Sequence, residues 1–303
     1  MVDVRIRVKI EDFEFPKDGL SKLDYWFYGR EGEDFVYYED ELFGKVDKVL
    51  LKNLRGEPEI CATPITPKID RFYAPRSRGS LSSITSAVRQ IKLIEKGYLA
   101  IHASCVSKEG VGILLAAFPN VGKTLSAHQL LSSDNEFRYI SDDTVLVDNK
   151  GTAYLTAFPS AAGYYDFLRF IKPKSVGRLK YYASFIKSWL MHKNKVLNRL
   201  LRPPHFNLAE IYPTTSQTKV KIVCTLEIGQ KQVKSTSPED MMKKIMAINE
   251  YSLPRFYNNP FIKVYDYFNV GYIDKIRQKE RDNLLSFLTN CECYKLACDD
   301  WNW

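Results

Sequence analysis

The segment Val111–Leu131, VGILLAAFPNVGKTLSAHQLL, constrains the fold of this chain more than any other stretch. The apolar run Val111–Ala117 predicts a buried strand, the turn-forming residues after it predict a tight loop, and Lys123 begins a helical pattern. Binding of a polyphosphate requires this order, because backbone N–H groups of the turn and the positive end of the helix surround the phosphates. The segment therefore predicts an α/β protein with a nucleotide-binding core.

The loop matches the signature G-x-x-x-x-G-K-[ST] except at its first position, where Ala117 replaces glycine. Lys123 is expected to reach the β- and γ-phosphates, and the Thr124 hydroxyl is expected to ligate Mg²⁺. Because alanine does not readily adopt a positive φ, we expect an unstrained or slightly altered backbone at the loop entry. The alternative is a chance Gly-Lys-Thr after a strand. The expected nucleotide-binding residues are Asn120, Val121, Gly122, Lys123, Thr124 and Leu125.

A length of 303 residues allows one large domain or two modest ones, and a hydrophobic content of 45% is ample for a packed core. We expect a β-rich N-terminal unit over residues 1–78 and the nucleotide-binding core over residues 79–303. No apolar run approaches the ~18–20 residues of a membrane span, and the N-terminus does not resemble a signal peptide. These features favour a cytoplasmic protein without a membrane partner. The spacing of the six cysteines is a poor zinc pattern and favours reduced structural thiols.

Two boundary signals and one turn signal help to place the elements. Ser80 or Ser82 is expected to cap a helix that ends at Gly97. Lys108-Glu109-Gly110 predicts a hairpin turn between the strand Leu99–Ser107 and the strand before the phosphate loop. A Ser-x-x-Asp cap at Ser237 predicts a further helix.

The net charge of +8 is concentrated in one segment. No Asp or Glu occurs from Phe167 to Ala209, and nine basic residues lie between Lys172 and Arg202. Such a block can dock an acidic partner, although a solvated helix face is a strong alternative. A membrane surface or single-stranded nucleic acid is disfavoured, because the aromatic residues have helical spacing typical of packing. A helix over Lys180–Arg202 is predicted to pack through Tyr181, Tyr182, Phe185, Trp189 and Val196.

Two adjacent carboxylates, Asp142 and Asp143, follow the apolar strand Phe137–Ser141. A parallel or mixed sheet brings such a strand end beside the phosphate loop, where one carboxylate can hold Mg²⁺ and the other can accept the proton of an incoming hydroxyl. The residues alone leave the assignment of the two roles open, and an ordinary turn is the simpler alternative. His102 lies within an alternating strand pattern, where a histidine is usually a core or edge residue.

Taken together, His102-Ala-Ser, the Gly-Lys-Thr loop and Ile-Ser-Asp142-Asp143 resemble the HPr kinase/phosphorylase family. The fold of that family also resembles the catalytic core of ATP-dependent phosphoenolpyruvate carboxykinase. The resemblance covers residues 102–158 well and the C-terminal half only loosely. It implies that Asp142 is the base for an acceptor serine, that Asp143 supports the metal with Thr124, and that His102 lies beside the transferring phosphate with Lys123. Ala117 and Asn120 depart from glycines usual in that loop, and a later signature of the phosphorolysis reaction is missing.

The resemblance implies an ATP- and Mg²⁺-dependent kinase that phosphorylates a serine of a protein or ribosomal peptide, such as a lasso-peptide precursor. It also allows a homo-oligomer, and Lys172–Arg202 would dock an acidic acceptor. The alternative is a non-catalytic nucleotide-binding protein that regulates or docks a partner. A GTPase is disfavoured, since Asn149-Lys150 continues as Gly-Thr rather than as the guanine-reading pattern. We do not expect nucleic acid as a partner.

Overall fold

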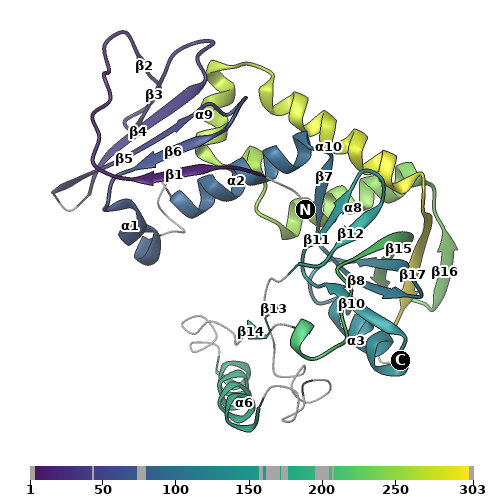
Figure 1. Cartoon of the computed structure of the whole chain (residues 1–303). Coiled ribbons are helices and arrows are strands. Elements are labelled where there is room, and N and C mark those ends of the chain that lie inside the picture. The colour runs from purple at the N-terminus through teal and green to yellow at the C-terminus, as the bar shows by residue number, and fades with distance from the viewer. Residues whose placement is uncertain are drawn as a thin grey trace. The chain divides into compact units, whose positions relative to one another are not determined.

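The computed structural model describes residues 4–42, 44–73, 80–156, 160–161, 171, 177–194, 205–206 and 208–299. Over these residues the chain is a mixed α/β protein with two mixed sheets and seven α-helices, which confirms the predicted class (Figure 1). It divides into two compact units, Met1–Tyr98 with Pro254–Asp282 and Leu99–Leu253 with Asn283–Trp303. The first unit thus extends past the boundary expected at residue 78, and it also includes Pro254–Asp282 from the C-terminal part of the chain.

The first unit is built on a six-stranded sheet in the order β1-β6-β5-β4-β3-β2. Its strands are β1 (Arg7–Ile10), β2 (Ser21–Lys22), β3 (Phe27–Gly29), β4 (Phe35–Leu42), β5 (Lys45–Lys52) and β6 (Glu59–Ala62). β1 pairs with β6 in parallel and the other neighbours are antiparallel. Its helices are α1 (Thr66–Tyr73), α2 (Leu81–Glu95), α9 (Pro260–Phe268) and the first part of α10 (Tyr272–Leu288).

One hydrophobic core joins this sheet to its helices. Strand residues such as Val36 and Tyr38 pack with Val88 of α2 and Phe261 of α9. The sequence did place α2 correctly: the Ser80 side chain accepts a hydrogen bond from the Ser83 N–H at 3.3 Å, and φ of Gly97 is 83° beyond the end of the helix. Of the two serines considered as caps, the structure therefore selects Ser80.

The second unit is built on a nine-stranded sheet in the order β10-β8-β9-β15-β12-β11-β7, with β17 paired to β15 and to β16. The strands are β7 (Tyr98–Ile101), β8 (Ala103–Lys108), β9 (Val111–Ala116), β10 (Phe137–Ser141), β11 (Val145–Asp148), β12 (Thr152–Tyr154), β15 (Gln217–Ile228), β16 (Gln232–Ser235) and β17 (Glu292–Cys298). β15 is parallel to both β9 and β17, whereas β8 is antiparallel to both β9 and β10. Separately, β13 (Ser160–Ala161) pairs with β14 (His205–Phe206).

Helices pack on both faces of the second sheet. Successive residues of β9 point to opposite faces, as the two-residue period of a strand requires. Leu114 packs with α8 (Pro238–Ser252) and the end of α10, whereas Leu115 packs with α3 (Lys123–Ser133). The cap predicted for α8 is present, because the Ser237 side chain accepts a hydrogen bond from the Asp240 N–H at 3.2 Å. The helix α3, which begins at Lys123, is therefore held on one face and α8 on the other.

The strand predicted over Leu99–Ser107 is in fact two strands, β7 and β8, which separate at His102. The His102 N–H donates to Asn249 Oδ1 at 2.8 Å, and Asn249 Nδ2 donates to the Ala100 carbonyl at 3.1 Å. A side chain of α8 thus bonds to the backbone on either side of the break. The hairpin turn predicted next is confirmed, since Glu109 and Gly110 both have positive φ between the antiparallel strands β8 and β9.

The basic helix is shorter than predicted. α6 (Arg178–Lys193) ends before Asn194, whose backbone is extended, and Val196 lies outside the described residues. Ser188 and Met191 are buried, and Tyr181 and Phe185 are half-buried beside Ile171. The prediction that Tyr182 and Trp189 also pack inward is wrong: both are exposed. They lie about 80–100° around the helix from Tyr181, at 100° per residue, and so fall outside the buried stripe.

None of the helices in the described part of the chain is long and apolar enough to span a membrane. The six cysteines are free thiols, four of them buried.

Candidate functional site

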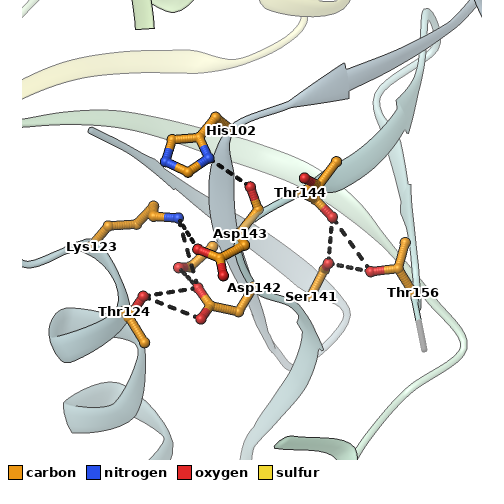
Figure 2. Close-up of polar contacts among 9 residues, drawn as sticks. His102, Lys123, Thr124, Ser141, Asp142, Asp143, Thr144 and Thr156 are labelled. Carbon is orange, nitrogen blue, oxygen red and sulfur yellow. Dashed lines mark hydrogen bonds and ion pairs between the residues drawn. The ribbon is translucent and has the colours of Figure 1, made fainter. Parts of the chain in front are cut away.

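Three chain segments meet at one edge of the second sheet because of its strand directions. β8 runs antiparallel to its neighbours β9 and β10, so the ends of β9 and β10 lie beside the beginning of β8. The loop with the Gly-Lys-Thr sequence follows β9, Asp142 follows β10, and His102 precedes β8. Figure 2 shows that Lys123, Thr124 and His102 converge on the two aspartates. The expectation that the strand end carrying Asp142 and Asp143 lies beside the loop is confirmed.

The loop adopts a conformation that explains its departures from glycine. Ala117 is buried in the core beneath α3 and does not have a positive φ, so no glycine is required there. Asn120 has φ of 66° and Gly122 has φ of 112°, in the left-handed region that asparagine tolerates and glycine adopts freely. Gly122 is the N-cap of α3 and has no side chain with which to cap the first N–H groups. These groups are therefore suited to an anion.

Val121 and Leu125, which the sequence also placed among the nucleotide-binding residues, are half-buried against the core beneath α3. Their side chains anchor the loop and the first turn of the helix. Any contact that they make with a phosphate would therefore come from their backbone N–H groups.

Lys123 joins the loop to both carboxylates. Its side chain is buried, and its Nζ donates to Asp143 Oδ1 at 3.1 Å and lies 4.0 Å from Asp142 Oδ1 (Figure 2). A single ammonium group therefore balances part of the charge of two adjacent carboxylates. The same ammonium is positioned at the N-terminus of α3, where a phosphate would also be attracted.

Asp142 is the buried member of the carboxylate pair, with 4% of its surface exposed. It accepts a hydrogen bond from Ser104 Oγ, and Thr124 Oγ1 donates to its carboxylate at 3.1–3.2 Å. Burial raises the pKa of the Asp142 carboxyl above its usual value, although the ammonium of Lys123 and the hydroxyl of Ser104 oppose the shift. Sequence analysis assigned Ser104 no role of its own, although it is the serine of the His102-Ala-Ser motif.

Asp143 lies at the centre of a tight three-residue turn. Its φ is 62°, and the Thr144 N–H donates to the Asp142 carbonyl at 2.8 Å. This is the hydrogen-bond pattern of a γ-turn with positive φ, a strained conformation that costs on the order of 1–3 kcal/mol. Ser141 supports the turn by donating to the Thr144 carbonyl at 2.7 Å (Figure 2). The turn leaves the Asp143 side chain 52% exposed, while Asp142 stays buried.

His102 is oriented by Asp143. Its Nδ1 lies 2.8 Å from the Asp143 carbonyl oxygen, which can only accept, so Nδ1 carries the proton and Nε2 is an acceptor. Burial, together with the ammonium of Lys123, lowers the pKa of His102, so the imidazole is neutral at pH 7. Asn249, a residue that sequence analysis missed, fixes the backbone of His102 from α8.

The oxygen atoms of Thr124 and Asp142 fit a Mg²⁺ ion. Adjacent ligands in a Mg²⁺ octahedron lie about 3 Å apart, because the metal–oxygen bonds are about 2.0–2.1 Å. The separation of 3.1–3.2 Å between Thr124 Oγ1 and the Asp142 oxygens matches this value. The described residues contain no cluster of three or more His, Cys, Asp or Glu suited to a metal. A cation here would therefore depend on phosphate oxygens and water for its other ligands.

The structure thus brings together all five side chains to which a chemical role was assigned: His102, Lys123, Thr124, Asp142 and Asp143. It adds Ser104 beneath Asp142 and Asn249 behind His102. Comparison of the sequence with models of known protein families and with curated proteins finds no match.

Proposed function

We propose that this chain is an ATP- and Mg²⁺-dependent kinase with a phosphate-loop core of the HPr kinase type. It transfers the terminal phosphoryl group to a hydroxyl, the side chain of a serine in a protein or peptide, and works in the cytoplasm. The observation that carries the proposal is the convergence of a helix N-terminus, a buried lysine and two carboxylates at one sheet edge. Phosphoryl transfer requires mainly positioning and charge neutralisation, and these groups supply both.

The geometry favours particular roles for the two carboxylates. The family resemblance assigns the base to Asp142 and the metal to Asp143. Asp142, however, is buried and bonded to Thr124, the expected Mg²⁺ ligand, whereas Asp143 is half-exposed and within reach of an incoming hydroxyl. We therefore assign Asp142 with Thr124 to the metal and Asp143 to the base. Bound Mg²⁺ would neutralise charge on the phosphate oxygens.

In this proposal, the serine Oγ forms a bond to the γ-phosphorus as the bond from that phosphorus to the oxygen of ADP breaks. The serine proton passes to the Asp143 carboxylate. Lys123 moves its ion pair from the carboxylates to the phosphate oxygens, which leaves Asp143 free to act as an acceptor. Neutral His102 holds the Asp143 carbonyl through Nδ1 and keeps Nε2 available as an acceptor near the transferring group.

We also propose that the basic segment Lys172–Arg202 docks acidic residues of the acceptor. The described part of this segment, α6, has exposed cations at Arg178 and Lys193 and contains no carboxylate. Attraction between exposed charges weakens with salt, since the screening length is about 8 Å at physiological ionic strength. The KM for an acidic acceptor should therefore rise with salt more steeply than the KM for ATP.

Nucleotide binding can be tested by thermal unfolding with Mg²⁺ and ATP or GTP. Mg²⁺–ATP at 100 times its Kd should stabilise the wild type by about 2.7 kcal/mol, which is a shift of several degrees. Lys123→Met should lose the shift, whereas Lys234→Met, at an exposed lysine of β16, should keep it. An absence of any shift in the folded wild type would contradict the proposal. A shift without phosphoryl transfer would favour the non-catalytic regulatory alternative.

The two carboxylates can be separated by matched variants. Asp143→Asn keeps a residue that tolerates positive φ and should lower phosphoryl transfer by about 10²- to 10⁴-fold while the Mg²⁺–ATP shift remains. Asp142→Asn should instead reduce the dependence of nucleotide binding on Mg²⁺. The opposite pattern would restore the assignment that the family resemblance implies. Transfer to water, measured as ATP hydrolysis, serves as the readout when no acceptor is added.

A further inference from the structure

Two aromatic side chains beside the candidate site are exposed and contact each other. Phe118 of the phosphate loop is 44% exposed and Tyr251 near the end of α8 is 73% exposed. Their ring centroids lie 5.4 Å apart with an angle of 78° between the ring planes. The two rings meet edge to face and both remain substantially exposed, and exposed aromatic area of this kind is well suited to an apolar ligand group.

Both aromatic residues lie near His102, at the end of the sheet where the candidate site is. Phe118 directly follows Ala117, which is buried beneath α3. Tyr251 follows two residues after Asn249, a buried side chain that bonds to the His102 N–H and to the Ala100 carbonyl. The end of α8 is thereby fixed to the backbone of His102. In the β8–β9 ladder Ala103 pairs with Ala116, so Phe118 leaves the end of β9 next to His102, and Tyr251 contacts Phe118 there.

In phosphoryl transfer, the acceptor and the nucleoside of ATP lie on different sides of the transferred phosphorus. The attacking and leaving oxygens lie on opposite sides of the phosphorus in an in-line transfer. The base Asp143 and its partner His102 mark the side from which the acceptor hydroxyl arrives. The nucleoside of ATP is attached on the opposite side. With Asp143 as the base, a platform next to His102 lies on the side of the phosphorus from which the acceptor arrives.

We infer that Phe118 and Tyr251 form a docking platform for an apolar side chain that flanks the acceptor serine. The inference rests on the proposed kinase function and specifies its substrate class as a peptide or protein segment with an aliphatic or aromatic residue beside the serine. Contact of such a side chain with the two rings should give a preference of roughly tenfold, which corresponds to about 1.4 kcal/mol. The acidic docking proposed for α6 concerns a separate part of the acceptor.

The test uses the full chain, Mg²⁺, γ-labelled ATP and pools of serine-centred peptides in which one flanking position is fixed in turn. The wild type should label pools with Leu, Phe or Tyr at one flanking position about tenfold more than pools with Ser or Asp there. Tyr251→Ser should lose this preference and Tyr251→Phe should keep it, because phenylalanine retains the ring. Tyr267→Ser, at an exposed tyrosine of α9, serves as a surface control. The thermal shift with Mg²⁺–ATP is measured for every variant.

Two results would overturn the inference: a preference that persists in Tyr251→Ser, or labelling without any apolar preference. Each of these leaves nucleotide binding intact. Failure of Mg²⁺–ATP to stabilise the folded wild type, or stabilisation without labelling in any pool, would instead remove the proposed kinase function itself. The two failures are therefore distinguishable within one set of measurements.

Discussion

His128 should make the stability of the α3 region depend on pH. The side chain is 2% exposed, and its Nδ1 lies 2.9 Å from the Tyr212 hydroxyl. Burial lowers the pKa of His128 to about 4, because the positively charged imidazolium is poorly solvated there. In the unfolded chain the same group has a pKa near its ordinary value of 6.5.

The sign and size of the effect follow from this difference. Between pH 6.5 and pH 4 the unfolded chain binds a proton at His128 that the folded chain excludes, so the free energy of unfolding falls as the pH falls. One pKa unit corresponds to about 1.36 kcal/mol, which sets a limit of about 3.4 kcal/mol for this residue. Most of it, about 3 kcal/mol, should be lost between pH 7 and pH 4.

Urea unfolding of the wild type and of His128→Phe at pH 7, 5.5 and 4 measures this contribution. The other titrating groups are common to both proteins, so the decrease in unfolding free energy should be about 3 kcal/mol smaller in the variant. The variant also loses the hydrogen bond to Tyr212, but that loss shifts the stability at every pH. Equal decreases in the two proteins would refute the reasoning, because His128 would then be protonated equally in the folded and unfolded chains.

Three further substitutions test backbone strain, a buried ion pair and a helix cap by urea unfolding. Asn120→Ala should destabilise by about 1 kcal/mol and Asn120→Gly should not, since φ is 66°; equal effects would contradict the loop conformation. Arg255→Met should cost about 3–5 kcal/mol because it leaves buried Glu280 unpaired, and adding Glu280→Leu should recover most of that loss. A double variant as unstable as the single one would argue against the ion pair. Ser237→Ala should lower the free energy of unfolding by about 1 kcal/mol, because it removes the N-cap of α8. An unchanged free energy of unfolding would show that this cap does not contribute to stability.

The parts of the fold that sequence analysis predicted correctly are those determined by neighbours in the chain. The strand, loop and helix around Lys123 follow from an apolar run, turn residues and a helical period, all within one short segment. The turn at Glu109-Gly110 and the caps of α2 and α8 are equally local. Even the meeting of Asp142 with the loop could be predicted, because parallel strands end at the same edge of a sheet.

Errors arose where a distant residue determines the local structure. The break at His102 depends on the side chain of Asn249, which lies 147 residues later, and nothing in the alternating strand pattern signals it. The buried face of α6 likewise depends on what covers it. Its aromatic residues lie within an arc of about 100°, and the sequence does not show which part of that arc is covered, so it cannot distinguish Phe185, which is half-buried, from Trp189, which is exposed.

The roles of Asp142 and Asp143 illustrate the limit most sharply, because the two residues are identical and adjacent. Their environments differ because of where each lies in the turn at Asp143, which has φ of 62°: one carboxylate is buried beside Thr124 and the other is exposed beside Lys123. A strained turn of this kind needs outside support, and Ser141 and the Thr144 backbone provide it. In the proposed kinase centre, the turn therefore decides which aspartate binds the metal and which accepts the proton, because the residue type is the same at both positions.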